Sequence, residues 1–284
     1  MLELKNLSFS YTSKPFIHNI SFTVQEGEVF GFLGPSGAGK STIQKLLIGM
    51  LPNYSGNVVV NSIEVKKHNN RFYESIGVDF EYSSLYDKLT ARQNLEFFAS
   101  LYSGEKYAID ELLREVGLYH DSDKRVSDFS KGMKSRLNFV KALIHKPKIL
   151  FLDEPTSGLD PSNARIMKDI IKKQKELGTT IILTTHNMED ATELCDRVAF
   201  IVDGEIKALD SPHSLIMQKG AKKLRYSYLT DEKEKEYTSE CFLNSTSTDK
   251  KLSALIMQNK LLTIHSSEPT LGDIFMDITG RRLS

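Results

Sequence analysis

The 284-residue sequence predicts an α/β fold, and two observations support that prediction. Short apolar runs recur at residues 29–33, 149–152 and 180–183, as in parallel strands that are covered on both faces. The segment after the first run, from Ile43 to Met50, repeats its apolar residues at helical spacing. Because strand, turn and helix follow one another, we expect a layered α/β core.

The first residues predict an antiparallel strand pair in front of this core. Apolar residues alternate imperfectly with polar ones over residues 2–11 and again over residues 20–24. Such alternation is typical of a sheet with one buried face. We therefore expect an N-terminal antiparallel β subdomain.

Residues 82–145 interrupt the strand pattern and predict an inserted helical subdomain. Their apolar residues, such as those from Leu95 to Leu101, recur at helical spacing beside charged residues. The pair Asp203-Gly204 then predicts a hairpin that closes the sheet near residue 210. We expect the first domain to span residues 1–218.

Residues 219–284 predict a small C-terminal accessory domain. The segment is rich in Lys, Glu, Ser and Thr, and its positive and negative charges nearly balance. Near its end, Thr270 and Asp273 resemble a helix cap in front of apolar residues that include Leu271 and Phe275. We expect a packed amphipathic helix there.

The composition excludes several classes of function. Thirty-seven Lys and Arg balance 37 Asp and Glu, so no global positive field attracts nucleic acid, and no nucleic-acid partner is expected. Cys195 and Cys241 have no second ligand at metal spacing, which fits a reducing compartment. No stretch approaches the roughly 18 apolar residues that span a bilayer, so a membrane role would require a partner.

The segment after the first buried strand matches the phosphate-binding pattern G-x-x-x-x-G-K-[ST]. Glycines let backbone N–H groups turn toward phosphates, and the following helix adds partial positive charge. Lys40 is expected to reach the β and γ phosphates, Ser41 to bind Mg²⁺, and Thr42 to add a phosphate contact. The predicted nucleotide-binding residues are Gly34, Pro35, Ser36, Gly37, Ala38, Gly39, Lys40, Ser41 and Thr42. The core is therefore expected to be a P-loop NTPase (RecA-like) core.

Three polar residues follow buried strands and are expected at the same sheet edge. Asp153 is predicted to hold Mg²⁺ and Glu154 to act as general base on the attacking water. His186 is predicted to contact the γ-phosphate and to hold Glu154. Tyr11, in the N-terminal sheet, is either a core aromatic or a stacking surface for adenine.

With further motifs, the chain resembles an ATP-binding cassette (ABC) ATPase over residues 1 to about 215. The motifs, in addition to the phosphate loop, are Phe129-Ser130-Lys131-Gly132-Met133, Asp153-Glu154, Ser157-Gly158-Leu159-Asp160 and His186. In that family two cassettes close head to tail, and the signature of one caps the γ-phosphate of the other. Ser130 and Gly132 match the signature, whereas Lys131 and Met133 depart from its usual Leu-Ser-Gly-Gly-Gln form.

The resemblance places Glu81 where the family usually has the glutamine of the Q-loop, which touches Mg²⁺ and the attacking water. A carboxylate there either tightens Mg²⁺ binding or raises a neighbouring pKa, and the alternative is a solvated hinge residue. The ending at residues 268–281 also resembles bacterial drug-export and related ABC-2 type subunits. This resemblance favours export over import.

The resemblance implies an ATP-binding and ATP-hydrolysing subunit that powers a separate integral membrane permease. Its cofactors are ATP and Mg²⁺, and it is expected in the cytoplasm, peripheral on the inner face of a bacterial cell membrane. It is expected to work as a homodimer or as a heterodimer of nucleotide-binding subunits. Residues 78–105 are expected to receive the permease. The main alternative is a soluble ABC ATPase acting on ribosomes or nucleic acid, and a nucleotide-sensing regulatory module is a third possibility.

Overall fold

The computed structural model describes residues 1–80, 84–219, 223–229, 236–267 and 269–280, which form two compact units. The first unit comprises residues 1–210, and the second begins at Ser211. This boundary lies eight residues before the expected one at residue 218. The difference arises because helix α8 (Pro212–Lys219) contacts helix α10 (Leu271–Thr279) of the second unit.

A six-stranded sheet forms the centre of the first unit, in the order β10-β9-β3-β8-β7-β6. Strands β6, β7, β8, β3 and β9 are parallel, and the β9–β10 hairpin turns at Asp203-Gly204. The strands are β3 (Val29–Leu33), β6 (Ile76–Asp79), β7 (Ile149–Asp153), β8 (Thr180–Thr185), β9 (Arg197–Val202) and β10 (Glu205–Asp210). Every residue of β3, β7 and β8 is buried, which explains their continuous apolar runs. The predicted α/β core is confirmed.

Helices α6 (Pro161–Glu176) and α7 (Met188–Leu194) connect strands of this sheet, and α1 (Lys40–Leu47) lies between β3 and β4 (Tyr54–Val60). Helix α1 follows β3, and its buried residues include Ile43, Leu46 and Leu47, the apolar positions read from the sequence. Helix α6 begins after Asp160, whose side chain accepts hydrogen bonds from the N–H groups of the first turn. The alternation of strand and helix agrees with the predicted layered fold.

A second, antiparallel sheet packs against the central one. Its order is β2-β1-β4-β5, formed by β1 (Leu2–Phe9), β2 (Ile17–Val24), β4 (Tyr54–Val60) and β5 (Ile63–Glu64). Leu4 and Val58 of this sheet belong to the same hydrophobic core as Phe30 and Ile182 of the central sheet. The predicted N-terminal strand pair is confirmed as β1 and β2.

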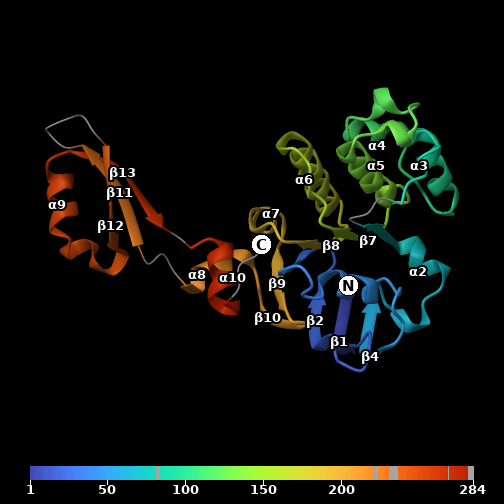
Figure 1. The fold of residues 1–284 in the computed structure, drawn as a ribbon, viewed down its shortest axis with the longest axis horizontal. Coiled ribbons are helices and arrows are strands. Elements are labelled where there is room, and N and C mark those ends of the chain that lie inside the picture. The colour runs from blue at the N-terminus through green and yellow to red at the C-terminus, as the bar shows by residue number, and fades with distance from the viewer. Residues whose placement is uncertain (81–83, 220–222, 230–235, 268, 281–284) are drawn as a thin grey trace. The chain divides into compact units, whose positions relative to one another are not determined.

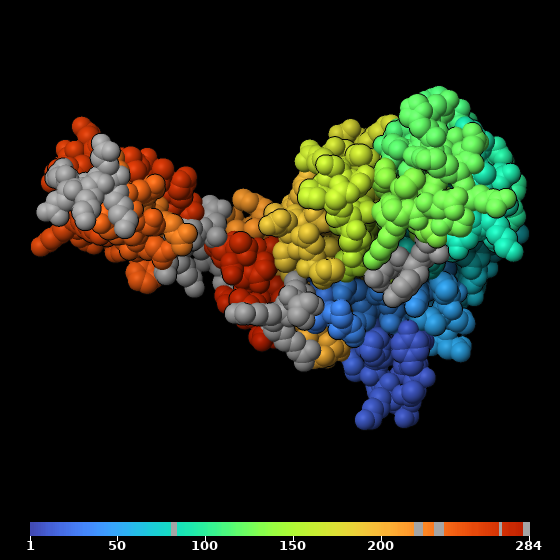
Figure 2. All heavy atoms as spheres, turned by 45° about the horizontal axis from the view of Figure 1, so that its top comes forward, coloured from blue at the N-terminus to red at the C-terminus, as the bar shows by residue number. Residues whose placement is uncertain are grey.

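The chain between β6 and β7 is helical. Its helices are α3 (Ala91–Ser100), α4 (Ile109–Glu115) and α5 (Lys131–Leu143), with 3-10 turns at residues 119–121 and 126–128, while α2 (Asn70–Ser75) and the turn at 65–67 precede β6. Figure 1 draws α3, α4 and α5 together, on the opposite side of β7 and β8 from β1, β2 and β4. In Figure 2 their side chains, coloured green, form a lobe beside those of α6, and Lys173 of α6 pairs with Glu115 of α4.

The second unit contains a three-stranded antiparallel sheet in the order β12-β11-β13. Its elements are α8, β11 (Lys223–Leu229), β12 (Glu236–Phe242), a 3-10 turn at 243–248, α9 (Lys250–Met257), β13 (Leu261–Ser267) and α10. Tyr226 of β11 packs with Leu252 and Leu255 of α9. Thr270 and Asp273 form the capping box of α10, as predicted. In the described ranges no helix is both long enough and apolar enough to cross a bilayer.

Candidate functional site

The phosphate-binding loop connects β3 to α1, and its glycines are required by its shape. Gly37 and Gly39 have φ of +78° and +109°, a region that other residues rarely adopt. A Cβ on Gly34 would lie 2.1 Å from the carbonyl oxygen of Ile201. The loop therefore folds closely against β9 and opens into the N-terminus of α1, as an anion site requires.

Lys40 lies across this loop as the first residue of α1. Its Nζ donates to the carbonyl oxygens of Gly34 at 2.7 Å and Pro35 at 3.2 Å. An ammonium has three N–H donors, so one remains for a phosphate oxygen. Burial lowers the pKa of Lys40, and the nearby carboxylates of Glu154 and Asp153 oppose that shift.

Ser41 and Asp153 meet beside the loop, as a divalent-cation site requires. The Ser41 hydroxyl donates to Asp153 Oδ1 at 3.2 Å, and the Thr184 hydroxyl donates to the same oxygen. Hydroxyl and carboxylate oxygens are the ligands that Mg²⁺ prefers. The donor set therefore fits Mg²⁺. Sequence analysis did not assign a role to Thr184, because Thr is common in strands and β8 contains three of them.

Glu154 and His186 lie side by side where β7 and β8 end. His186 Nδ1 is 2.9 Å from Glu154 Oε2, and the His186 backbone N–H is 3.4 Å from the same oxygen. Glu154 has a φ of +53°, and its N–H donates to the carbonyl of Thr184 at 3.0 Å. The side chain of Glu154 is 14% exposed, whereas that of His186 is 54% exposed. The sheet edge thus holds a half-buried carboxylate beside a histidine side chain that is more than half exposed.

Tyr11 adjoins the loop through its hydroxyl, which lies 3.1 Å from Thr42 Oγ1. Its ring contacts Phe9 and Phe16 and remains 56% exposed. Phe16, which sequence analysis did not single out, lines the cavity over the phosphate loop. An exposed aromatic ring beside a phosphate site is suited to stacking, so adenine stacking by Tyr11 stays a prediction.

Ser130 and Gly132 lie at the start of α5, away from the loop. Ser130 is the exposed N-cap of α5, and its hydroxyl accepts from the N–H of Met133 at 3.2 Å. The described residues that line the cavity over the loop include Ser36, Lys40 and Glu154, but neither Ser130 nor Gly132. The structure thus brings together Lys40, Ser41, Asp153, Glu154 and His186, but not the signature residues. Glu81 lies outside the described residues.

Sequence analysis did not identify Asp79, a buried carboxylate beside the site. Asp79 ends β6, is 5% exposed and accepts from Asn138 Nδ2 at 2.5 Å. Burial raises the pKa of Asp79 to about 7; Lys141 and Asn138 oppose this rise, and Asp153 adds to it. The signal in the sequence was an acidic residue within the apolar run Ile76 to Phe80.

The raised pKa of Asp79 predicts that the folded state loses stability as the pH rises. In the unfolded chain its carboxyl ionises near pH 3.8, whereas the folded chain keeps the proton up to about pH 7. Between these values the folded state binds more protons, so its stability falls by at most about 1.4 kcal/mol per pH unit. Asp79→Asn, whose amide oxygen still accepts from Asn138, should remove this loss.

Urea unfolding of Asp79→Asn and the wild type across this pH range measures the effect. The variant should gain about 1 to 4 kcal/mol over the wild type between pH 4 and pH 7, and no more above pH 7. Asp123→Asn, at a side chain that is 87% exposed, is the matched control and should show no such gain. If the free energy of unfolding of Asp79→Asn and of the wild type changes with pH by the same amount, the prediction is wrong.

The known proteins that are similar to this chain belong to one family. The model of the ABC transporter family matches residues 17–157. A fluoroquinolones export ATP-binding protein of Mycobacterium tuberculosis is 47% identical, over 100% of this chain and 95% of that protein. A linearmycin resistance ATP-binding protein of Bacillus subtilis is 32% identical, over 100% of this chain and 99% of that protein.

Solved structures agree with these relatives. An ATP-binding subunit of an ABC transporter matches with a TM-score of 0.71 and 30% identity, over 77% of this chain and 93% of that chain. A dimeric ATP-binding cassette in a post-hydrolysis state, bound to ADP and Pi, matches with a TM-score of 0.67 and 25% identity, over 74% of this chain and 98% of that chain. The chain therefore belongs to the ABC transporter family of ATP-binding proteins, as its motifs indicated.

Proposed function

We propose that this chain hydrolyses ATP to power export through a separate integral membrane permease. The observation that carries the proposal is the Glu154–His186 pair, 2.9 Å apart, because Glu154 lines the same cavity as Lys40 and Ser41. Relatives matched over the whole chain are named for fluoroquinolone export and linearmycin resistance. The proposed location of the chain is the cytoplasm, at the inner face of a bacterial cell membrane.

The loop residues bind and orient the triphosphate. Backbone N–H groups of residues 36–41 and the free donor of Lys40 contact the phosphate oxygens. Ser41 and Asp153 hold Mg²⁺, which when bound offsets the charge of the phosphates. Tyr11 supports the adenine from the loop between β1 and β2, not from within the N-terminal sheet as the sequence suggested. These contacts place the γ-phosphate next to Glu154.

Glu154 accepts a proton from the water that attacks the γ-phosphorus. The new P–O bond forms as the bond to the β,γ-bridging oxygen breaks, and ADP and phosphate leave. A carboxylate oxygen only accepts, so the 2.9 Å contact with Glu154 requires a proton on His186 Nδ1. A hydrogen bond from His186 Nε2 to a phosphate oxygen requires a second proton, so His186 makes both contacts as an imidazolium. His186 thus orients the base and contacts the group that is transferred.

Ser130 and Gly132 serve a second nucleotide-binding chain. In their own chain they do not line the cavity over the phosphate loop. An exposed N-cap hydroxyl and the N–H groups of α5 form an anion-binding end. Closure of two such chains, identical or paralogous, brings this end to the partner's γ-phosphate. Dimeric cassettes among the matched structures support this arrangement.

An apolar groove on the first unit is the docking site for the permease. The groove has a volume of about 300 Å³ and is lined by residues that include Met50, Tyr73, Val78, Phe98 and Leu101. Met50 is 56% exposed and Leu101 is 61% exposed, although both are large and apolar. Such an apolar patch, which includes Val78 of β6, suits a helix of a membrane partner.

Purification from native membranes tests the partner. The tagged chain, carrying Glu154→Gln to hold the ATP-bound state, is solubilised in mild detergent with Mg-ATP. An integral membrane protein at fixed stoichiometry is the expected result. Leu101→Glu should reduce its recovery by about tenfold or more, because a charge in an apolar interface loses its hydration.

Leu177→Glu provides the control, because Leu177 is also 61% exposed but lies at the end of α6. The Leu177→Glu variant should recover as much membrane protein as the chain without this substitution. Both variants should bind ATP normally. Recovery of ribosomes, nucleic acid or no partner would overturn the export proposal in favour of a soluble ATPase.

A further inference from the structure

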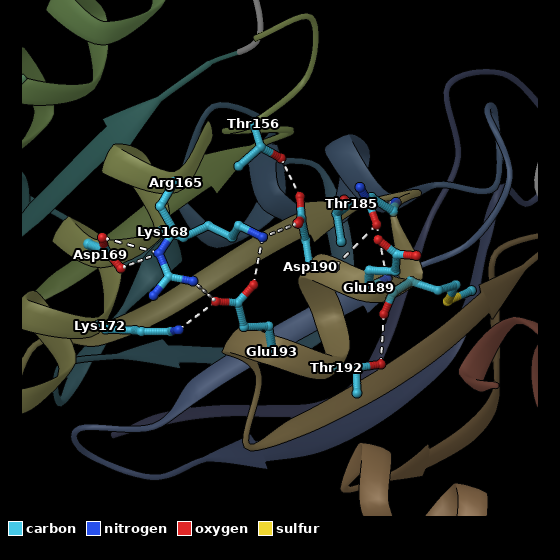
Figure 3. Close-up of polar contacts among 12 residues, drawn as sticks. Thr156, Arg165, Lys168, Asp169, Lys172, Thr185, Glu189, Asp190, Thr192 and Glu193 are labelled. Atoms are coloured by element: carbon cyan, nitrogen blue, oxygen red, sulfur yellow. Dashed lines mark hydrogen bonds and ion pairs between the residues drawn. The ribbon is translucent and has the colours of Figure 1, made fainter. Parts of the chain in front are cut away.

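A half-buried hydrogen bond joins the two segments that carry Glu154 and His186. Thr156 Oγ1 donates to Asp190 Oδ2 at 2.5 Å, as Figure 3 shows. Thr156 stands two residues after Glu154, and Asp190 stands four residues after His186, about one helical turn away. The bond therefore links the same two segments as the Glu154–His186 contact.

The carboxylate of Asp190 is held from both sides. Its Oδ1 pairs with Lys168 Nζ of α6 at 3.0 Å, while its Oδ2 accepts from Thr156. Asp190 is 6% exposed, and the side chain of Lys168 is 17% exposed. Lys168 also pairs with Glu193 at 2.6 Å, so α6 and α7 are joined by ion pairs (Figure 3). A buried, fully paired carboxylate has little freedom to move.

Helix α7 links this carboxylate rigidly to His186. The Asn187 side chain caps α7 by accepting from the N–H groups of Glu189 and Asp190. The N–H of Asn187 donates to Thr185 Oγ1 at 2.9 Å. His186 thus lies between a strand end and a capped helix start, and its position follows that of α7.

We propose that Asp190 and Thr156 are positioning residues that set the distance between Glu154 and His186. The inference rests on the proposed ATP hydrolysis. His186 contacts Glu154 Oε2 through Nδ1 at 2.9 Å and through its backbone N–H at 3.4 Å. Because the His186 side chain is 54% exposed, water can compete for the side-chain contact. The half-buried Thr156–Asp190 bond fixes the segment after Glu154 against the helix after His186. Catalysis depends on such placement, because a shift of about 1 Å costs up to about 10²-fold in rate.

Two substitutions at Thr156 separate the hydroxyl from the packing. Thr156→Val keeps the shape and removes the donor, which also leaves an oxygen of Asp190 without that partner. It should lower kcat by about 10- to 100-fold with a KM for ATP within about twofold of the wild type. Thr156→Ser keeps the donor and should restore kcat to within about twofold. Rates are measured at protein concentrations where turnover per chain no longer rises.

Thr192→Val is the matched control on α7. The Thr192 hydroxyl is exposed and donates to the carbonyl of Met188 at 2.7 Å, with no contact to the Glu154 segment (Figure 3). This variant should keep the wild-type kcat. Thermal unfolding of all variants then shows whether a change in rate merely follows a change in stability.

A double substitution tests whether the bond acts through His186. In the His186→Ala background, Thr156→Val should lower the single-turnover rate by no more than about twofold, because the pair it positions is already gone. An additional loss as large as in the wild type would overturn the inference. So would wild-type kcat in Thr156→Val, or equal losses in Thr156→Val and Thr156→Ser that track lowered stability. Failure of the wild type to hydrolyse ATP would instead overturn the proposed function.

Discussion

Replacing Glu154 by Gln should lower ATP turnover by about 10²- to 10⁴-fold while ATP remains bound. Gln keeps the shape of Glu and can still accept from His186 Nδ1, which lies 2.9 Å from the carboxylate. It cannot take a proton from water, so only the chemical step is lost. The proposed phosphate ligand Lys40 and the proposed Mg²⁺ ligand Ser41 are unchanged in this variant.

Steady-state hydrolysis and equilibrium ATP binding, measured on the same preparation, check this result. Glu189→Gln is the control, because Glu189 is an exposed carboxylate in the first turn of α7. It should hydrolyse ATP at the wild-type rate. A Glu154→Gln chain with unchanged turnover would remove Glu154 from the role of general base.

Replacing Lys40 by Ala should weaken ATP binding itself, by about 10- to 200-fold. A charge-assisted hydrogen bond contributes about 1.5 to 3 kcal/mol, and each 1.4 kcal/mol is a tenfold change in affinity. Lys40 also donates to the carbonyls of Gly34 and Pro35, so its loss loosens the loop that orients the phosphates. Both effects reduce affinity rather than the chemical step.

Calorimetric titration with Mg-ATP measures the change, and Lys45→Ala is the control. Lys45 lies in the last turn of the same helix, α1, and is not among the residues lining the cavity over the loop. Its replacement should leave the affinity for ATP unchanged. If Lys40→Ala binds ATP as tightly as the wild type, the loop is not the phosphate site.

The main elements of the site follow from local patterns in the sequence. Gly37 and Gly39 predicted a loop with positive φ, and the apolar period after Ile43 predicted α1, because both depend on residues close in the chain. Asp153 and His186 were expected at one edge because parallel strands end together. The capping box at Thr270 likewise needs only four residues.

Other features depend on residues far apart in the chain, and only the tertiary structure decided them. The pKa of Asp79 is raised because folding buries its carboxyl group against α5, and the residues around position 79 do not predict that burial. The boundary moved to residue 210 because α8 contacts α10, which lies more than 50 residues later.

The sequence by itself determined the α/β core, the phosphate loop and the family, because these are written in short motifs and in the periodicity of apolar residues. The tertiary structure decided which side chains meet: Tyr11 with Thr42, Glu154 with His186, and Thr156 with Asp190. The physical reason is that a hydrogen bond requires a definite distance and direction between two atoms. For residues 30 or more positions apart, only the packing of the folded chain supplies that geometry.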